Sequence, residues 1–144
     1  MKRIIGLLLL FTVLSCKKQS EDTLTSSDWL LESATVSPAM TIGSKTSTDY
    51  KNLFGPGSCL ASNYTLSFNN NGTYTSGSNG ALCDLLVSTE ASKWSIDGNT
   101  INLSGSGGFK QTATLANKSL TYTSVSTNND VTYTIVYIFK AKSR

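Results

Sequence analysis

The stretch SKWSIDGNTINLS, residues 92–104, decides the fold class. Period-2 alternation puts Trp94 and Ile96 on one face of a strand over residues 92–97. The Asp97-Gly98-Asn99 step that follows has the chemistry of a tight hairpin turn, and a second β-rich segment begins at Thr100. The stretch therefore predicts two neighbouring antiparallel strands.

The same pattern recurs on both sides of this hairpin. Segments rich in β-branched and aromatic residues are separated by glycine and asparagine turns, and no long helical period follows the first fifteen residues. The sequence thus predicts an all-β chain with eight strands. These strands cover residues 28–36, 63–69, 72–76, 92–97, 100–104, 109–115, 119–126 and 131–141.

The connections between the predicted strands alternate between tight and loose. Tight turns are expected at 69–72, 97–99 and 116–118, and looser links at 37–62, 77–91, 105–108 and 127–130. In an up-and-down arrangement alternate links lie at opposite ends of the sheet, so all tight turns gather at one end. The pattern predicts a closed cup whose rim carries the long loops 37–62 and 77–91.

The first of these loops contains TDYKNLFGP, residues 48–56. Thr48 or Asp49 can cap a helix, Tyr50, Leu53 and Phe54 share one side, and Gly55-Pro56 ends it. We expect a short helical turn here, acting either as a lid over the cup or as a permanent plug.

The N-terminus has the pattern of an export signal. Residues 1–15 combine Lys2 and Arg3 with an apolar run from Ile4 to Leu14, which is shorter than the roughly 20 residues of a membrane-spanning helix. The segment Val13-Leu14-Ser15-Cys16 resembles the lipobox of bacterial lipoproteins, in which the cysteine is lipidated. We expect a lipoprotein signal peptide over 1–15, lipidation of Cys16, a flexible tether over 16–27 and a single domain over 28–144; an ordinary signal peptide with a chance cysteine is the alternative.

The composition argues against several functional classes. The chain has 12 basic and 9 acidic residues; without Lys2 and Arg3 the balance becomes 10 to 9, so nothing favours nucleic-acid binding. With no histidine, neither a cysteine-histidine nor a serine-histidine-acid site can be built, and two cysteines make a poor zinc site. We expect no catalytic residues, metal ligands or cofactor, hence a protein that is not an enzyme.

Cys59 and Cys83 remain as an even pair once Cys16 carries lipid. They fall in two links that the predicted topology puts at the same end of the barrel. We therefore predict a disulfide between Cys59 and Cys83.

The aromatic residues carry the functional signal. Alternation places tyrosines and other apolar side chains on single strand faces, where they can line a cavity with apolar walls and a few hydroxyls. The alternative is that these side chains fill the barrel, with Trp29 in the core of the closed end. The candidate ligand-binding residues are Phe54, Tyr64, Leu66, Trp94, Tyr122, Tyr133 and Tyr137.

Three segments together resemble the lipocalin-like domain of small bacterial lipoproteins of the Bacteroidetes type. They are LTSSDWLLESATVSP (24–38), CLASNYTLSFNNNGTYT (59–75) and KWSIDGNTINL (93–103). The resemblance covers residues 24–144 and implies an eight-stranded antiparallel barrel that encloses a small apolar ligand.

Together these patterns predict a protein anchored by lipid to the bacterial outer membrane, facing the periplasm or the cell surface, that binds a small, mostly apolar molecule. The alternative is a protein-interaction module, an envelope-complex subunit or an inhibitor, that uses the rim loops 37–62 and 77–91.

Overall fold

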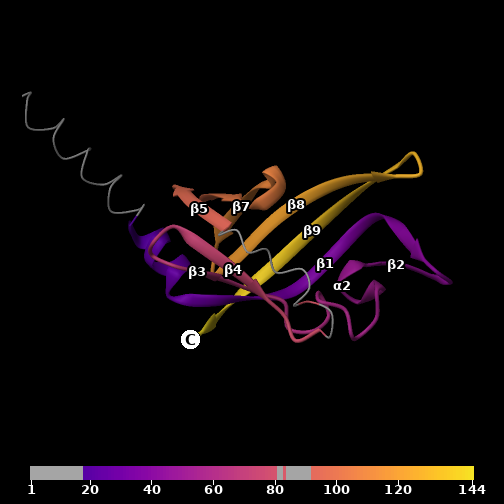
Figure 1. The fold of residues 1–144 in the computed structure, drawn as a ribbon, viewed down its shortest axis with the longest axis horizontal. Coiled ribbons are helices and arrows are strands. Elements are labelled where there is room, and N and C mark those ends of the chain that lie inside the picture. The colour runs from indigo at the N-terminus through magenta and orange to yellow at the C-terminus, as the bar shows by residue number, and fades with distance from the viewer. Residues whose placement is uncertain (1–17, 81–82, 84–91) are drawn as a thin grey trace, which may run out of the picture.

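The computed structural model of the chain describes residues 18–80, 83 and 92–144, and most of them belong to one antiparallel sheet (Figure 1). Two short helical elements, α2 (Tyr50–Leu53) and the 3-10 turn η2 (Ser106–Gly108), lie in the links between strands. The strands are β1 (Ser27–Ile42), β2 (Lys45–Asp49), β3 (Thr65–Phe68), β4 (Thr73–Gly77), β5 (Ser92–Asp97), β6 (Thr100–Ser104), β7 (Lys110–Ala116), β8 (Ser119–Asn128) and β9 (Val131–Ser143).

Eight of these strands close into a barrel. Each pairs with its neighbour in the order β1-β3-β4-β5-β6-β7-β8-β9, and β9 returns to pair with β1. The closing ladder runs from Ser27 opposite Ser143 to Ser37 opposite Thr134. This confirms the predicted all-β, eight-stranded, up-and-down barrel.

The prediction of an irregular loop over 37–62 is wrong for its first part. β1 continues to Ile42 and turns back into β2, which pairs with β1 alone. Gly43 has a φ of 60°, the left-handed conformation that a two-residue hairpin turn needs, and the Thr41 and Thr46 hydroxyls lie 2.8 Å apart across the pair. The β-branched residues around this glycine are therefore strand residues.

The tight turns gather at one end of the barrel, as predicted, because consecutive strands pair throughout the closed sheet. A helix over residues 18–25 also lies at this end, where the Ser20 and Asn99 side chains are hydrogen-bonded. Its Leu24 is completely buried, and the Trp29 indole N–H donates to the Leu24 carbonyl at 2.9 Å. Thus the predicted flexible tether is wrong for residues 18–25, whereas Trp29 is core at the closed end, as expected.

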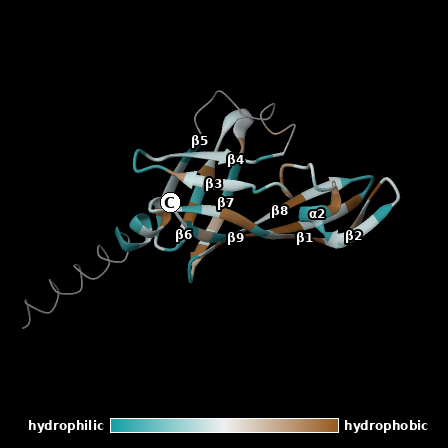
Figure 2. Cartoon of the chain, turned by 90° about the horizontal axis from the view of Figure 1, so that it is seen from below, coloured by the Kyte–Doolittle hydropathy of each residue, from teal (hydrophilic) through white to brown (hydrophobic). Residues whose placement is uncertain are grey.

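Alternation along the strands builds the core. Hydrophobic and hydrophilic residues alternate on the ribbons of Figure 2, and on β5 the pattern leaves Trp94 and Ile96 buried between exposed neighbours. The largest fully buried side chains are Trp29, Phe68, Phe139, Leu24, Leu31, Ile101 and Leu120. These side chains fill the closed end and the middle of the barrel.

The opposite end carries α2 and two projecting hairpins. The expected helical turn is confirmed: the Asp49 side chain accepts from the Asn52 backbone N–H at 3.2 Å and caps α2. Lys51 fastens α2 to the barrel wall, since its ammonium donates to the Leu31 carbonyl at 2.9 Å and the Glu32 carbonyl at 3.1 Å, beside a register shift in β1. The β1–β2 and β8–β9 hairpins extend beyond the barrel on the side away from helix 18–25 (Figure 1).

Candidate functional site

The candidate site is a column of aromatic rings that runs from the rim into the barrel. Tyr50 of α2 meets the ring of Phe54 edge-on at 5.5 Å on its outer side and that of Tyr137 at 6.1 Å on its inner side. Tyr137 of β9 stacks on Tyr122 of β8 with 4.5 Å between ring centroids. These distances lie within or at the edge of the range for favourable aromatic pairs.

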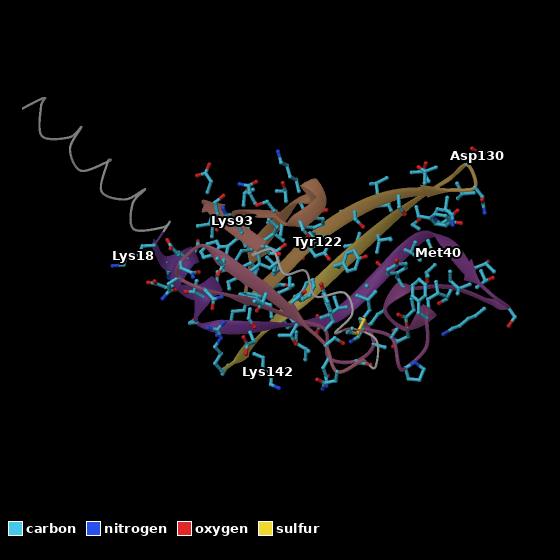
Figure 3. All side chains as sticks on the ribbon, in the orientation of Figure 1. Lys18, Met40, Lys93, Tyr122, Asp130 and Lys142 are labelled. Atoms are coloured by element: carbon cyan, nitrogen blue, oxygen red, sulfur yellow. A yellow bond between two sulfur atoms is a disulfide. The ribbon has the colours of Figure 1, made fainter. Side chains whose placement is uncertain are left out.

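The column continues downward to the packed core. The Tyr122 ring lies 5.9 Å from that of Phe139, which lies 6.1 Å from Tyr64. Figure 3 shows Tyr122 on β8, beside β9, whose Tyr137 is its partner in the strand register. Phe139 is completely buried, so it marks the floor of the column.

Burial changes along this column. Phe139 and Trp29 are inaccessible, whereas Tyr50, Tyr64, Tyr122 and Tyr137 are only partly buried although they pack against the core. The barrel is thus fully packed at Phe139, whereas the tyrosine rings toward the rim keep part of their surface accessible.

The hydroxyls of Tyr64, Tyr122 and Tyr137 stay neutral over the physiological range. Burial raises the pKa of Tyr122 far above its ordinary value, and it raises the pKa of Tyr137 to about 12 with a smaller contribution from Tyr50. Burial also raises the pKa of Tyr64, partly offset by a hydrogen bond with Ser76. The mouth therefore offers apolar ring faces with neutral hydroxyls, suited to orienting an uncharged ligand.

The structure brings together some of the predicted ligand residues and separates others. Tyr64, Tyr122 and Tyr137 belong to the column, and Phe54, 48% exposed, joins it at the rim through Tyr50. Leu66 is a buried core residue.

Trp94 and Tyr133 lie elsewhere. Trp94 packs edge-on against Phe68 and donates its indole N–H to the Asn69 carbonyl at 3.0 Å, beside a tight turn. Tyr133 lies opposite Ser126 on the projecting part of the β8–β9 hairpin. Neither residue reaches the aromatic column. The prediction fails for them because period-2 alternation indicates which face of the sheet a side chain lies on, but not its position along the barrel axis.

One residue of the column, Tyr50, and one residue beside the disulfide, Leu60, are absent from the predicted ligand set. Tyr50 links the rim to the inner rings, and Leu60 packs partly buried against the core. The signal for Tyr50 is present in the sequence, since it shares one side of the helical turn with Leu53 and Phe54. Leu60 belongs to no periodic pattern, so only the disulfide beside it indicates its position.

The disulfide between Cys59 and Cys83 holds this rim in place. The two Cα atoms lie 5.5 Å apart, which confirms the predicted pairing (Figure 3). Around it, the Ser78 hydroxyl lies 2.7 Å from both the Cys59 and the Ser62 carbonyls, and the Asn79 backbone N–H donates to the Ser62 carbonyl at 2.7 Å. The link that carries Leu60 is thus fixed by a covalent bond and by several hydrogen bonds.

Comparisons of the chain with protein-family models, with curated proteins and with solved structures find no match. Within residues 18–80, 83 and 92–144, no group of three or more cysteine, aspartate or glutamate side chains could hold a metal ion. No helix in these residues is long and apolar enough to cross a membrane. Cys16 and most of the link 77–91 lie outside the described residues.

Proposed function

We propose that this protein is a non-enzymatic binding protein, anchored by lipid on Cys16 to the bacterial outer membrane, that takes a small, mostly apolar ligand at the mouth of its barrel. The observation that carries the proposal is the change in burial along the aromatic column. Rings that point into the barrel stay partly accessible at Tyr50, Tyr64, Tyr122 and Tyr137, above a fully packed floor. The resemblance to lipocalin-like lipoproteins supports the same function.

The chemistry of the mouth favours an uncharged ligand with a flat or elongated apolar body. The ring faces and edges can make dispersion contacts with the apolar body of a ligand and match its shape. The neutral hydroxyls of Tyr122 and Tyr137 can orient a single polar group of that ligand. A ligand that stacks on Tyr137 would take the place of water there, with α2 and its Tyr50 as one wall.

Binding of a neutral apolar dye, N-phenyl-naphthylamine, to the purified full chain tests the proposal. We expect a rise in dye fluorescence that is saturable, with affinity lowered about tenfold in Tyr137→Ala, as losing one stacked ring contact of roughly 1.4 kcal/mol requires. Tyr133→Ala is the matched control, because it removes the same side chain from the projecting hairpin and should leave affinity unchanged.

Absence of dye binding, or equal losses in the two variants, would contradict the proposal. Native mass spectrometry of protein from its own host then identifies the natural ligand by its mass. A Tyr64→Ala and Tyr122→Ala pair separates binding from packing, since a binding role predicts a greater loss of affinity than of stability.

One observation favours the alternative function, a protein-interaction module. The β1–β2 and β8–β9 hairpins and the rim near them carry four exposed large apolar side chains, Ile42, Phe54, Val125 and Val131, of which Val125 is 65% exposed. Gentle detergent extraction of the lipoprotein from its host, followed by size-exclusion chromatography, tests it. A partner retained by the native chain and lost in Val125→Asp would support the module.

A further inference from the structure

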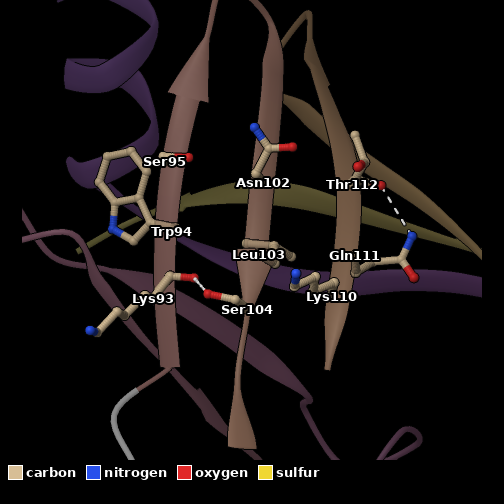
Figure 4. Close-up of a pocket in the computed structure, with 9 residues that line it drawn as sticks. All are labelled: Lys93, Trp94, Ser95, Asn102, Leu103, Ser104, Lys110, Gln111 and Thr112. Atoms are coloured by element: carbon tan, nitrogen blue, oxygen red, sulfur yellow. Dashed lines mark hydrogen bonds between the residues drawn. The ribbon is translucent and has the colours of Figure 1, made fainter. Parts of the chain in front are cut away.

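A concave surface lies on the outer face of the barrel, across β5, β6 and β7. It forms a groove of about 580 Å³ (Figure 4). The strand register arranges its outward side chains in two rows. The first row is Lys93, Ser104 and Lys110, and the second is Ser95, Asn102 and Thr112.

The groove is polar on every outward position. Of the residues that alternate with these rows, Trp94 and Leu103 are buried and Gln111 is half-buried, so hydroxyl, amide and ammonium groups stand beside carbon atoms along the groove. Three neighbouring strands span about 10 Å, and the two rows lie about 7 Å apart along the strands. These dimensions fit a short saccharide.

The groove is also basic. Among the residues that line it there is no acidic side chain, and neither Lys93 nor Lys110 forms an ion pair with any other part of the chain that the structure describes. In Figure 4 the Lys110 side chain extends from β7 toward Ser104 on β6, whereas Lys93 extends from β5 away from β6. Lys110 thus covers the groove, and the exposed Lys93 flanks its other side.

We propose that this groove binds an anionic oligosaccharide. A carboxylate or sulfate group lies over Ser104 beside the Lys110 ammonium, Lys93 adds positive charge at the edge of the groove, and ring hydroxyls exchange hydrogen bonds with Ser95, Asn102 and Thr112. Ammonium groups supply charge-assisted hydrogen bonds, and hydroxyl and amide side chains both donate and accept, as sugar hydroxyls require. This site is separate from the aromatic mouth in chemistry and in position.

Amide chemical shifts of the isotope-labelled full chain, titrated with hexagalacturonate and with a sulfated hexasaccharide, test the proposal. We expect at least one of them to shift the amides of Lys93, Asn102 and Lys110 but not those of Tyr122 and Tyr137. The double variant Lys93→Ala/Lys110→Ala should bind about tenfold more weakly, and the affinity of the native chain should fall as salt is added. Lys142→Ala removes one charge from β9 and should bind as the native chain does.

Several results would overturn the proposal. These are no shift with either charged oligosaccharide, equal binding of neutral maltohexaose, equal binding of inorganic phosphate alone, or an undiminished affinity in the double lysine variant. Unchanged thermal unfolding of that variant, expected for two exposed lysines, ensures that a loss of binding reflects the groove.

Discussion

At the scale of single residues, the rim depends on Gly80. A Cβ at this position would lie 2.7 Å from the Cys83 sulfur, closer than real Cβ atoms approach their neighbours, and 3.0 Å from the Gly57 carbonyl oxygen, which is tighter than most real Cβ contacts. We expect Gly80→Ala to lower the free energy of unfolding by about 1–3 kcal/mol, because backbone around the disulfide must move. Urea unfolding measures this, and Gly77→Ala, which meets nothing within 4 Å, is the control. Equal stability of the two variants would contradict the tight packing.

Ionisation of Tyr137 makes the free energy of unfolding depend on pH in the alkaline range. Its pKa in the folded chain is raised to about 12, above the ordinary value of 10.0, so the folded state holds this proton more tightly than the unfolded chain does. The resulting stabilisation is complete below pH 10 and is lost as the pH rises toward about 12. We expect the free energy of unfolding, measured by urea titration, to fall less steeply over this pH interval in Tyr137→Phe than in the native chain. Identical slopes for the two proteins would mean that Tyr137 ionises freely in the folded chain.

At the scale of elements, helix 18–25 packs against the closed end of the barrel and is not a flexible tether. Leu24 is completely buried and its carbonyl accepts from Trp29. We expect Leu24→Ala to lower the urea unfolding midpoint, with a loss of about 2–5 kcal/mol for a buried leucine. Gln19→Ala, exposed on the same helix, should have little effect. A Leu24→Ala variant as stable as the native chain would mean that residues 18–25 behave as the flexible tether that the sequence predicts.

The sequence predicts the barrel strands better than the segments that decorate them. Alternation and turn chemistry locate β5 and β6 at their observed bounds, because half-buried strands leave a period-2 pattern. The helix 18–25 has one large apolar residue, so no amphipathic period reveals it, and its position depends on contacts with Trp29, just beyond the helix, and with the distant Asn99. The β1–β2 hairpin is similarly hidden, since the Ser and Pro before Gly43 and the Ser, Lys and Thr after it resemble loop composition.

The candidate site shows the same division. Tyr64, Tyr122 and Tyr137 are predictable because face and strand suffice to place them near one another across a barrel. Trp94 and Tyr133 have the right face but the wrong height, which is set by strand stagger and by how far β8 and β9 project. The position of a side chain along the barrel axis depends on the register of every strand pair. The pattern of a single sequence does not show that register.

At the scale of the whole molecule, the barrel has a packed closed end and a mouth whose order depends on one covalent tie. The disulfide joins cysteines 24 residues apart, and replacing both by serine should lower the free energy of unfolding by about 3–4 kcal/mol through the unfolded chain's added freedom. The mouth should loosen further than the closed end, because Leu24, Trp29 and the paired strands hold the latter independently.

Hydrogen exchange separates these two effects of the double variant. The Asn79 amide, bonded to the Ser62 carbonyl at 2.7 Å beside the disulfide, should lose its protection first. The Leu115 amide, bonded to the Asn99 carbonyl at 2.8 Å at the closed end, should lose only what the global destabilisation accounts for. Equal losses at the two amides would mean that the barrel opens as a single unit. A selective loss at Asn79, accompanied by weaker dye binding, would show that the disulfide orders the proposed binding site at the mouth.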